Sequence, residues 1–450
     1  MEERRRTLIL IAATAGAIMV PLNTSMVSVA LAPIMTAFGL TVAQATWLVL
    51  LYLVVITSLQ PTAGKLGDRF GHRRVFLAGL LFFGLASVGA ALAPAFWVLV
   101  LCRVLQGFTA STLGPNAAAL IRLAYPIERQ GQAMGLYVGI FSMGLTVGPV
   151  LGGLLVNWVG WQGIFWVNVP TVMLSALIGF MVLPTAHAAQ KVPFDWGGTA
   201  LFGALVAGIV LVANTSKTGG LPVPMWVMIP VLAALALGLY RQEGRAEDPL
   251  IKFSLFRSRG FSASNLSIFL TNTMVYVVLV AMPLYLQSGR GLSAAASGVQ
   301  MALFSAMQLV APVAGRLSDR WGRQVPVLIG GGLFLAGWAG LLLVTQGSSL
   351  VWVTVPLLLA GTGYGLTQAP IQAACLSALP RADVGVGSGV WYSSRYLGNV
   401  AGALFSSLLL PHELAQGAPV LWWTQVAVAV ALMASARLLP AHGEELAAAD

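Results

Sequence analysis

The sequence contains few charged residues, few histidines and almost no cysteine. Only 8% of its 450 residues are charged and 58% are hydrophobic, whereas a soluble domain carries about 25% charged residues. A water-soluble fold is therefore excluded, because lipid is the solvent that suits so apolar a chain. The two cysteines, Cys102 and Cys375, lie inside apolar stretches, so we expect small core residues rather than a disulfide or a metal site.

The residue clusters on which enzymes and ATP-driven pumps depend are also missing. The sequence has no phosphate-binding loop of the Walker type, and its four histidines show no metal-ligand spacing. We therefore expect no catalytic residues, no cofactor and no bound metal. A net charge of +10 could indicate nucleic acid, but in a membrane protein basic loops more often set the orientation and contact anionic lipids. Membrane lipids, and not nucleic acid, are the expected partners.

Apolar stretches long enough to cross a bilayer are abundant. A span needs about 20 apolar residues, and its interior must be helical because lipid offers no partner for an unpaired backbone amide. The pattern predicts an all-α integral membrane protein with fourteen transmembrane helices. The predicted spans are 8–33, 44–64, 75–94, 97–121, 133–157, 163–184, 197–214, 223–240, 262–286, 293–315, 325–345, 350–377, 385–410 and 418–437.

Basic residues gather at alternate ends of these spans. Of the 24 lysines and arginines, 20 lie on one side, and only Lys217 and Arg290 lie on the other. The remaining two, Arg103 and Arg395, lie within spans. Because basic loops stay in the cytoplasm, this bias predicts a multi-pass protein of the cell (inner) membrane with both termini cytoplasmic.

A sequence repeat divides the chain. The segment GKLGDRFGHRR at 64–74 returns as GRLSDRWGRQV at 315–325, and QGFTASTLGP at 106–115 has a looser counterpart, GTGYGLTQAP, at 361–370. An offset of about 250 residues predicts two six-helix halves with an insertion between them. We expect an N-terminal six-helix bundle at 1–190, two inserted transmembrane helices with a cytoplasmic linker at 191–259, and a C-terminal six-helix bundle with a short tail at 260–450. The protein is expected to act as a monomer.

Further motifs accompany the repeated loop in a consistent order. They are LCRVLQGFTAS at 101–111, GLTVGPVLGGLL at 144–155, GWQGIFWVNVP at 160–170, DPLIKFSLFRSRGFS at 248–262 and SSRYLGNVAG at 393–402. With these motifs the chain resembles the major facilitator superfamily, and more narrowly its fourteen-helix drug:proton antiporter family. The resemblance covers nearly the whole chain. It implies a secondary active transporter that exports small amphipathic substrates by alternating access in exchange for protons. The rival interpretation is a carrier or facilitator for one lipid or metabolite without proton coupling.

Two segments are candidates for a gate. A carboxylate in the repeated loop can cap a neighbouring helix or pair with a basic residue, and Gly64 and Gly67 allow close backbone approach and a tight bend there. Gly144, Gly148 and Gly152 share one helix face, which suits tight packing, and Pro149 bends that helix. The resemblance implies that the loop latches the cytoplasmic side and that the glycine face meets the opposite bundle, although ordinary helix packing predicts the same glycines. The predicted gating residues are Gly64, Asp68, Arg69, Arg73, Gly144, Gly148, Pro149, Gly152, Asp319 and Arg320.

Arg103 is the most informative residue of the predicted substrate and proton cavity. An arginine at a helix centre costs about 2.5–3.5 kcal/mol on insertion scales, so it normally faces a cavity or a partner. The resemblance places Arg103 in a central cavity and implicates it in proton coupling; the alternative is a structural strut held by backbone carbonyls. Arg395 has Trp391 and Tyr392 one turn away, so cation–π contact is feasible, and a snorkelling role is equally open. The predicted cavity residues are Asn23, Met26, Trp47, Arg103, Gln106, Tyr137, Met143, Asn272, Tyr276, Met307, Tyr364, Gln368, Trp391, Tyr392 and Arg395.

The first span, MVPLNTSMVSVALAPI at 19–34, departs from the family pattern. Asn23 stands where the family has aspartate, and Ser28 where it has asparagine. All acidic residues and histidines lie in loops, at helix ends or in the tails, so no span interior holds a group that titrates near neutral pH. An amide cannot carry the proton. Three explanations stay open: a variant in which asparagine imitates protonated aspartate, an antiporter that uses an edge residue such as Asp68, or a facilitator without proton coupling.

Overall fold

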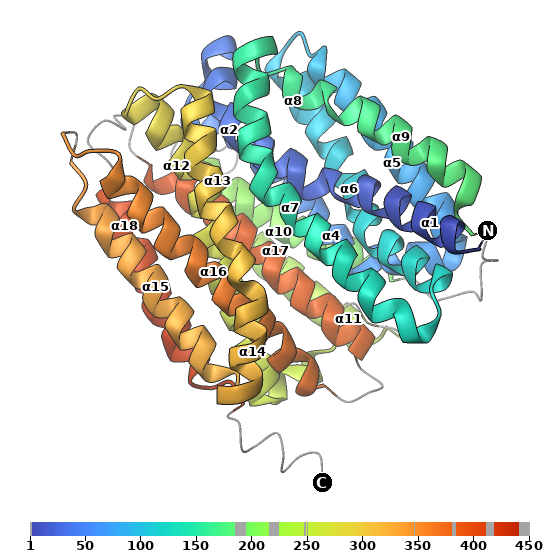
Figure 1. The fold of residues 1–450 in the computed structure, drawn as a ribbon. Helices are drawn as coiled ribbons and strands as arrows, with labels where there is room; N and C mark the ends of the chain where they lie inside the picture. The colour runs from blue at the N-terminus through green and yellow to red at the C-terminus, as the bar shows by residue number, and fades with distance from the viewer. Residues whose placement is uncertain are drawn as a thin grey trace. The chain divides into compact units, whose positions relative to one another are not determined.

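The regular structure of the chain is helical. The computed structural model describes residues 2–184, 195–215, 225–246, 249, 251–345, 347–379, 384–410 and 418–440, and every regular element in these ranges is a helix (Figure 1). The chain divides into two compact units. The first comprises Met1–Val212 and Pro222–Asp248, and the second comprises Ala213–Leu221 and Pro249–Asp450.

The first unit contains the helices of the first eight predicted spans. They are α1 (Glu2–Ala17), α2 (Met19–Phe38), α3 (Val42–Ala45), α4 (Trp47–Phe70), α5 (His72–Ala91), α6 (Phe96–Ala124), α7 (Ile127–Val159), α8 (Gly163–Trp166), α9 (Asn168–Val182), α10 (Trp196–Thr215) and α11 (Met225–Glu243). Spans one, two and six are each built from two consecutive helices. Turns that need positive φ fall on glycine, at Gly39, Gly71 and Gly160, where no Cβ opposes that conformation.

The repeated loop of the first unit is mostly helical. α4 continues past Gly64 and Gly67 to Phe70, and the chain reverses at Gly71, whose φ is 91°. Gly67 provides close approach instead of the bend, since a Cβ there would overlap Asn116 Oδ1 on α6. The bend expected at the first two glycines of the motif therefore lies at its third.

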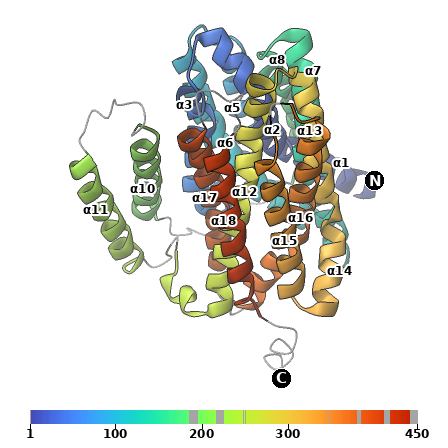
Figure 2. The same cartoon turned by 90° about the vertical axis from the view of Figure 1, so that its left-hand side faces the viewer.

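Small residues set the packing of the first unit. A Cβ at Gly107 on α6 would lie 2.9 Å from the Tyr52 carbonyl on α4, so α4 and α6 touch backbone to backbone. The two inserted helices pack on each other (Figure 2), because a Cβ at Gly208 of α10 would lie 2.7 Å from Leu232 of α11. α10 also reaches α4, where a Cβ at Gly203 would lie 3.1 Å from Ser58 Oγ.

The second unit contains the helices of the last six predicted spans. They are η1 (Phe253–Arg257), α12 (Arg259–Leu284), the π-helical turn η2 (Tyr285–Gly289), α13 (Ala294–Ala306), η3 (Met307–Val310), α14 (Ala311–Trp321), α15 (Gln324–Leu342), α16 (Val351–Ser377), α17 (Val384–Leu409) and α18 (Pro419–Ala436). Span ten is interrupted by η3 and continues as α14. Gly398 and Gly402 of α17 face the α12 backbone, where Cβ atoms would overlap the carbonyls of Phe269 and Thr273.

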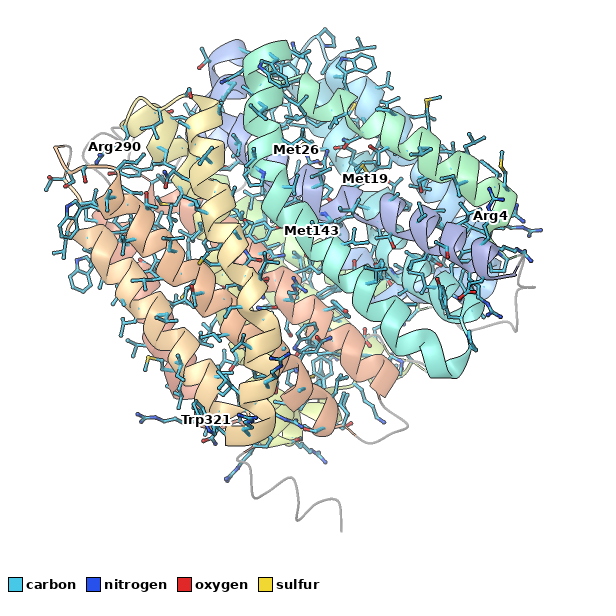
Figure 3. The ribbon with its side chains drawn as sticks, viewed as in Figure 1. Arg4, Met19, Met26, Met143, Arg290 and Trp321 are labelled. Carbon is cyan, nitrogen blue, oxygen red and sulfur yellow. The ribbon has the colours of Figure 1, made fainter. Side chains whose placement is uncertain are left out.

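Each predicted span coincides with one helix or with two or three consecutive helices, so the all-helical prediction is confirmed. Within the described ranges, nine stretches are long enough and apolar enough to cross a membrane; they include Glu3–Phe38 and Arg259–Gly289. The count of fourteen crossings therefore stays a prediction. Arg290 and Trp321, which the charge bias assigns to opposite sides of the membrane, lie at opposite ends of the second unit (Figure 3).

Candidate functional site

Arg103 is the centre of a buried polar network in the first unit. Its side chain is only 1% exposed. Its Nε donates to the Leu48 carbonyl at 3.2 Å, and its Nη1 donates to Asn23 Oδ1 and, at 2.8 Å, to Gln106 Oε1. The guanidinium also lies over the Tyr52 ring, 4.1 Å from its centroid. Three helices, α2, α4 and α6, thus hold one cation by hydrogen bonds and a cation–π contact.

Asn23 occupies the first helix of this network and is fully buried. Its Oδ1 accepts from Arg103, whereas its Nδ2 has no hydrogen-bond partner among the described residues. An unpaired buried donor is unfavourable. A carboxylate at this position would keep the bond to Arg103 and would remove the unpaired donor. The geometry therefore suits aspartate at least as well as the asparagine that the sequence has.

Ser87 extends the network to two further helices, and sequence reasoning missed it. Its hydroxyl donates to the Phe83 carbonyl at 2.8 Å on its own helix, α5. It accepts from Gln106 Nε2 at 2.8 Å and from Asn168 Nδ2, at the start of α9, at 3.2 Å. A serine hydroxyl has one proton, which is used on the Phe83 carbonyl, so both amides must present N–H to Ser87.

The acceptor role of Ser87 orients Gln106 toward Arg103. Because Nε2 of Gln106 faces Ser87, its Oε1 faces the guanidinium. The opposite orientation would set two donors against each other at the guanidinium and two acceptors against each other at Ser87. Asn168 could have been noticed as the polar residue in the otherwise apolar FWVNVP stretch, but nothing in the sequence marks Ser87.

The remaining predicted residues of the first unit serve mainly in packing. Met26 of α2 is fully buried beneath α7, where a Cβ at Gly152 would lie 3.0 Å from its Cα. Tyr137 is buried, and its hydroxyl donates to the Gly114 carbonyl at 3.3 Å, which links α7 to α6. Met143, also on α7 (Figure 3), is 50% exposed. Trp47 begins α4 and is half-buried.

In the second unit, the structure brings four of the predicted residues together on α16 and α17. Arg395 Nη2 donates to the Tyr364 hydroxyl at 3.3 Å. The Trp391 ring meets Tyr392 edge to face, 5.1 Å between centroids. The contact recorded for Arg395 is thus a hydrogen bond to Tyr364, in place of the expected cation–π contact with Trp391 or Tyr392. Gln368 Nε2 and Trp391 Nε1 are buried and have no hydrogen-bond partner among the described residues.

Three other predicted residues of this unit lie within its helix packing. Asn272 is buried and donates to the Ile268 carbonyl one turn back at 2.9 Å. Tyr276 is buried against α17, where a Cβ at Gly402 would lie 2.7 Å from its own Cβ. Met307 begins η3, and a Cβ at Gly361 of α16 would lie 3.0 Å from its Cβ.

The glycine face of α7 packs inside its own unit. A Cβ at Gly148 would overlap Ser25 Oγ on α2, and one at Gly144 would lie 2.9 Å from Ile18 Cγ1. Ser25 also donates to the Gly144 carbonyl at 3.3 Å. Pro149, one residue further along α7, is buried. In this structure the face performs the tight helix packing that was the alternative expectation, and its gating role stays a prediction.

The side chains of Asp68 and Asp319, and the side-chain surroundings of Gly64, lie outside the described part of the chain. Their neighbours are described. Arg69 is exposed with its guanidinium 5.5 Å from the centroid of the Phe70 ring, and Arg320 is exposed. Arg73 Nη2 donates to the Phe180 carbonyl near the end of α9 at 2.7 Å.

The residues that follow the third glycine of the motif make equivalent contacts in both units. His72 Nδ1 is 2.8 Å from Asn116 Oδ1 on α6, and at the equivalent position Arg323 donates to Ser377 Oγ and, at 2.6 Å, to the Ala373 carbonyl on α16. The next residue of each copy bonds at the end of the sixth span of its bundle: Arg73 to the Phe180 carbonyl, and Gln324 to the Leu439 carbonyl at 2.6 Å. Each loop thus ties together the ends of the third, fourth and sixth spans of its own unit.

Known proteins with similar sequences belong to one transporter family. The model of the Major Facilitator Superfamily matches residues 13–403. The chain is 32% identical over 427 residues to multidrug resistance protein Stp of Mycobacterium tuberculosis (strain CDC 1551 / Oshkosh), covering 91% of this chain and 78% of that protein. It is 30% identical over 425 residues to the tetracenomycin C resistance and export protein of Streptomyces glaucescens, covering 92% and 77%.

A solved structure supports the fold at greater evolutionary distance. The chain superposes on the crystal structure of a D-xylose-proton symporter with a TM-score of 0.70, covering 97% of this chain and 98% of that one at 16% identity. At this identity the likeness concerns the fold alone.

Proposed function

The chain belongs to the Major Facilitator Superfamily, and from that premise we propose that it exports small amphipathic, lipophilic compounds by alternating access. It is a membrane transporter and not an enzyme. Two relatives named above are a multidrug resistance protein and an export protein for tetracenomycin C. These names support the export of drugs as the activity.

The observation that carries the proposal is the buried arginine of the first unit. A cation held between α2, α4 and α6, with an amide where an acid is expected, has the form of a coupling centre. Arg103 bonds to one backbone carbonyl, that of Leu48, as a structural arginine would. It also contacts the side chains of Asn23, Gln106 and Tyr52, and such partners can exchange with a substrate or a proton.

The proposal treats Asn23 as an imitation of the neutral, protonated state. In a proton-coupled exporter, substrate and proton compete for a cavity carboxylate. An amide keeps the shape of the neutral acid and cannot lose a proton. The chain should therefore bind substrate with little dependence on pH between about pH 5.5 and 8, where no side chain of ordinary pKa within the spans titrates. The second candidate for the site of the coupling proton is Asp68, near the end of α4.

The test compares the chain with its Asn23→Asp variant in proteoliposomes. Substrate counterflow measures exchange without a gradient, and a pH jump measures proton-driven efflux. We expect counterflow in both forms and a clear gain of pH-driven efflux in Asn23→Asp. Asn265→Asp, an acid placed at a buried asparagine of the second unit, is the matched control and should give no such gain. Full proton-driven export by the Asn23 form, with nothing added by the acid, would move the coupling site elsewhere.

A facilitator without proton coupling is the second candidate function. The buried neutral amide at Asn23 favours it, together with the absence of acidic residues from the span interiors of the sequence. Counterflow that persists with no pH-driven efflux, even in Asn23→Asp, would identify this alternative.

The topology belongs to the proposal as well. We propose fourteen crossings of the inner membrane, cytoplasmic termini, a monomer, and the division into bundles 1–190 and 260–450 with two inserted helices between them. The charge bias and the 250-residue repeat support this arrangement. Labelling of single cysteines placed at positions 4, 217, 290 and 437 tests it: positions 4 and 437 should react only from the cytoplasm, and positions 217 and 290 only from outside.

A further inference from the structure

The contact between α16 and α17 aligns two pairs of polar side chains. These helices are consecutive along the chain and antiparallel, and the hydrogen bond from Arg395 to Tyr364 fixes their register. One turn forward on α16 is Gln368, and one turn back on α17 is Trp391. A turn rises about 6 Å on either helix, so Gln368 and Trp391 stand opposite each other next to the first pair. Tyr364, Gln368, Trp391 and Arg395 are called the α16–α17 donor cluster below.

The polar atoms left over in this cluster are hydrogen-bond donors. Gln368 Nε2 and Trp391 Nε1 are buried without a hydrogen-bond partner in the described residues, and Trp391 is 3% exposed. The guanidinium of Arg395 has five donors, of which one bonds to Tyr364. Neither an indole nor a guanidinium can accept a hydrogen bond, so Trp391 and Arg395 cannot satisfy each other.

Acidic residues are scarce on the helices around these donors. The sequences of α12, α13, α15, α16, α17 and α18 contain no aspartate or glutamate, and α14, which packs against α16, carries one, Asp319, in its last turn. Buried donors are normally paired, and those that remain unpaired in a native protein point to water, an ion or a ligand. A positive charge beside two oriented N–H groups selects an oxygen anion among these.

We propose that the α16–α17 donor cluster binds an anionic oxygen group of the transported compound, such as a carboxylate or a sulfonate. Arg395 supplies the charge, and Trp391 and Gln368 supply N–H groups. The rings of Trp391 and Tyr392, which meet edge to face, pack against the apolar body of the ligand. The inference rests on the proposed export of amphipathic compounds and names their charge. It predicts acidic amphiphiles in preference to cationic ones.

Arg323, at the start of α15 in the same unit, shows how a structural arginine binds α16. It bonds to the Ala373 carbonyl and the Ser377 hydroxyl near the end of that helix. Arg395 has no such carbonyl contact among the described residues and bonds instead to a tyrosine hydroxyl in the middle of α16. A snorkelling arginine would extend toward the helix end, whereas Arg395 joins the middle of one helix to the middle of the next.

The test uses two probes of the same shape that differ in charge. 8-Anilinonaphthalene-1-sulfonate carries a sulfonate, and N-phenyl-1-naphthylamine is its uncharged parent. Their affinities are measured with the full-length protein in nanodiscs of phosphatidylcholine, with empty nanodiscs as background. The variants are Arg395→Gln, Arg395→Lys and Trp391→Phe, the last of which removes one N–H and keeps an aromatic ring. Trp423→Phe, at an exposed tryptophan of α18, is the matched control.

Loss of a hydrogen bond to a charged group weakens binding roughly tenfold to a hundredfold. We expect that loss for the sulfonate in Arg395→Gln, about tenfold in Trp391→Phe, and partial recovery in Arg395→Lys, because lysine keeps the charge without the planar fork. The uncharged parent should bind all forms alike, and Trp423→Phe should match the unmodified protein with both probes.

Equal changes for the two probes, or no change for the sulfonate in folded variants, would overturn the proposal and leave water as the occupant. Thermal unfolding identifies a variant that fails to fold, in which case Arg395→Lys and Trp391→Phe decide the question. The assay measures binding alone. Selective sulfonate binding without counterflow would contradict export and leave the site standing, whereas counterflow without selective binding would contradict only the site.

Discussion

Removal of the Ser87 hydroxyl tests the reasoning about the buried network most directly. In Ser87→Ala, the side-chain donors Gln106 Nε2 and Asn168 Nδ2 both lose their acceptor, and both residues are fully buried. Each buried donor left unsatisfied costs about 1–3 kcal/mol. Some relaxation is expected because Gln106 can rotate, so we expect a loss of about 2–4 kcal/mol in the free energy of unfolding, which is large for a change of one atom.

The same reasoning predicts how this loss depends on Asn168. In Asn168→Leu the second donor is absent, and Ser87→Ala on that background should cost about 1–3 kcal/mol less than it does alone, because one orphaned group no longer exists. Reversible unfolding of the four proteins in mixed micelles with increasing dodecyl sulfate provides the double-mutant cycle. Strictly additive effects, or a Ser87→Ala effect below about 0.5 kcal/mol, would refute the acceptor role of Ser87.

Ser87 should also affect transport through Gln106, which it positions without touching Arg103. In the Asn23→Asp form, Ser87→Ala should shift the pH profile of efflux, because Gln106 loses the acceptor that holds its Oε1 against the guanidinium. A purely structural serine would lower the amount of folded transporter and leave the pH profile of the remainder unchanged. Ser87→Thr keeps the hydroxyl and should retain the original profile.

Two further predictions concern packing and the repeated loop. Gly148→Ala should destabilise the first unit by about 1–3 kcal/mol, since its Cβ would overlap Ser25 Oγ and lie 3.1 Å from the Leu22 carbonyl. Gly315→Ala on α14 is the control: no atom lies within 4 Å of its Cβ, so it should be neutral or stabilising by up to about 1 kcal/mol. Equal shifts in the melting temperatures of the two variants would contradict this reasoning. Arg323→Ala should speed amide hydrogen exchange near the end of α16, because the bonds to Ala373 and Ser377 are lost. Arg320→Ala, at an exposed arginine, should leave that exchange unchanged. Unaltered exchange in Arg323→Ala would show that these two bonds do not stabilise the end of α16.

The sequence alone was sufficient to predict the helices and the central residues of the candidate site. The apolar stretches coincide with helices because a bilayer fixes their length and leaves the backbone no other way to satisfy its amides. The cost of an arginine in an apolar helix singled out Arg103, and the i, i+3 spacing placed Gln106 beside it. The departure at Asn23 was visible from the family pattern, and the hydrogen bond from Arg103 joins these three residues.

Only the tertiary structure decided which faces meet. Helical periodicity shows that Gly144, Gly148 and Gly152 share a side, but the packing against α2 depends on contacts more than one hundred residues apart in the chain. Ser87 and Asn168 carry no local signal, since a serine or an asparagine in an apolar helix has many possible partners until the neighbouring helix is in place. The placement of Gln368 opposite Trp391 in the proposed site likewise follows from the register of α16 on α17, which the bond between Arg395 and Tyr364 sets. The sequence determines which polar groups and packing faces each helix has, and the packed fold determines which partners they contact.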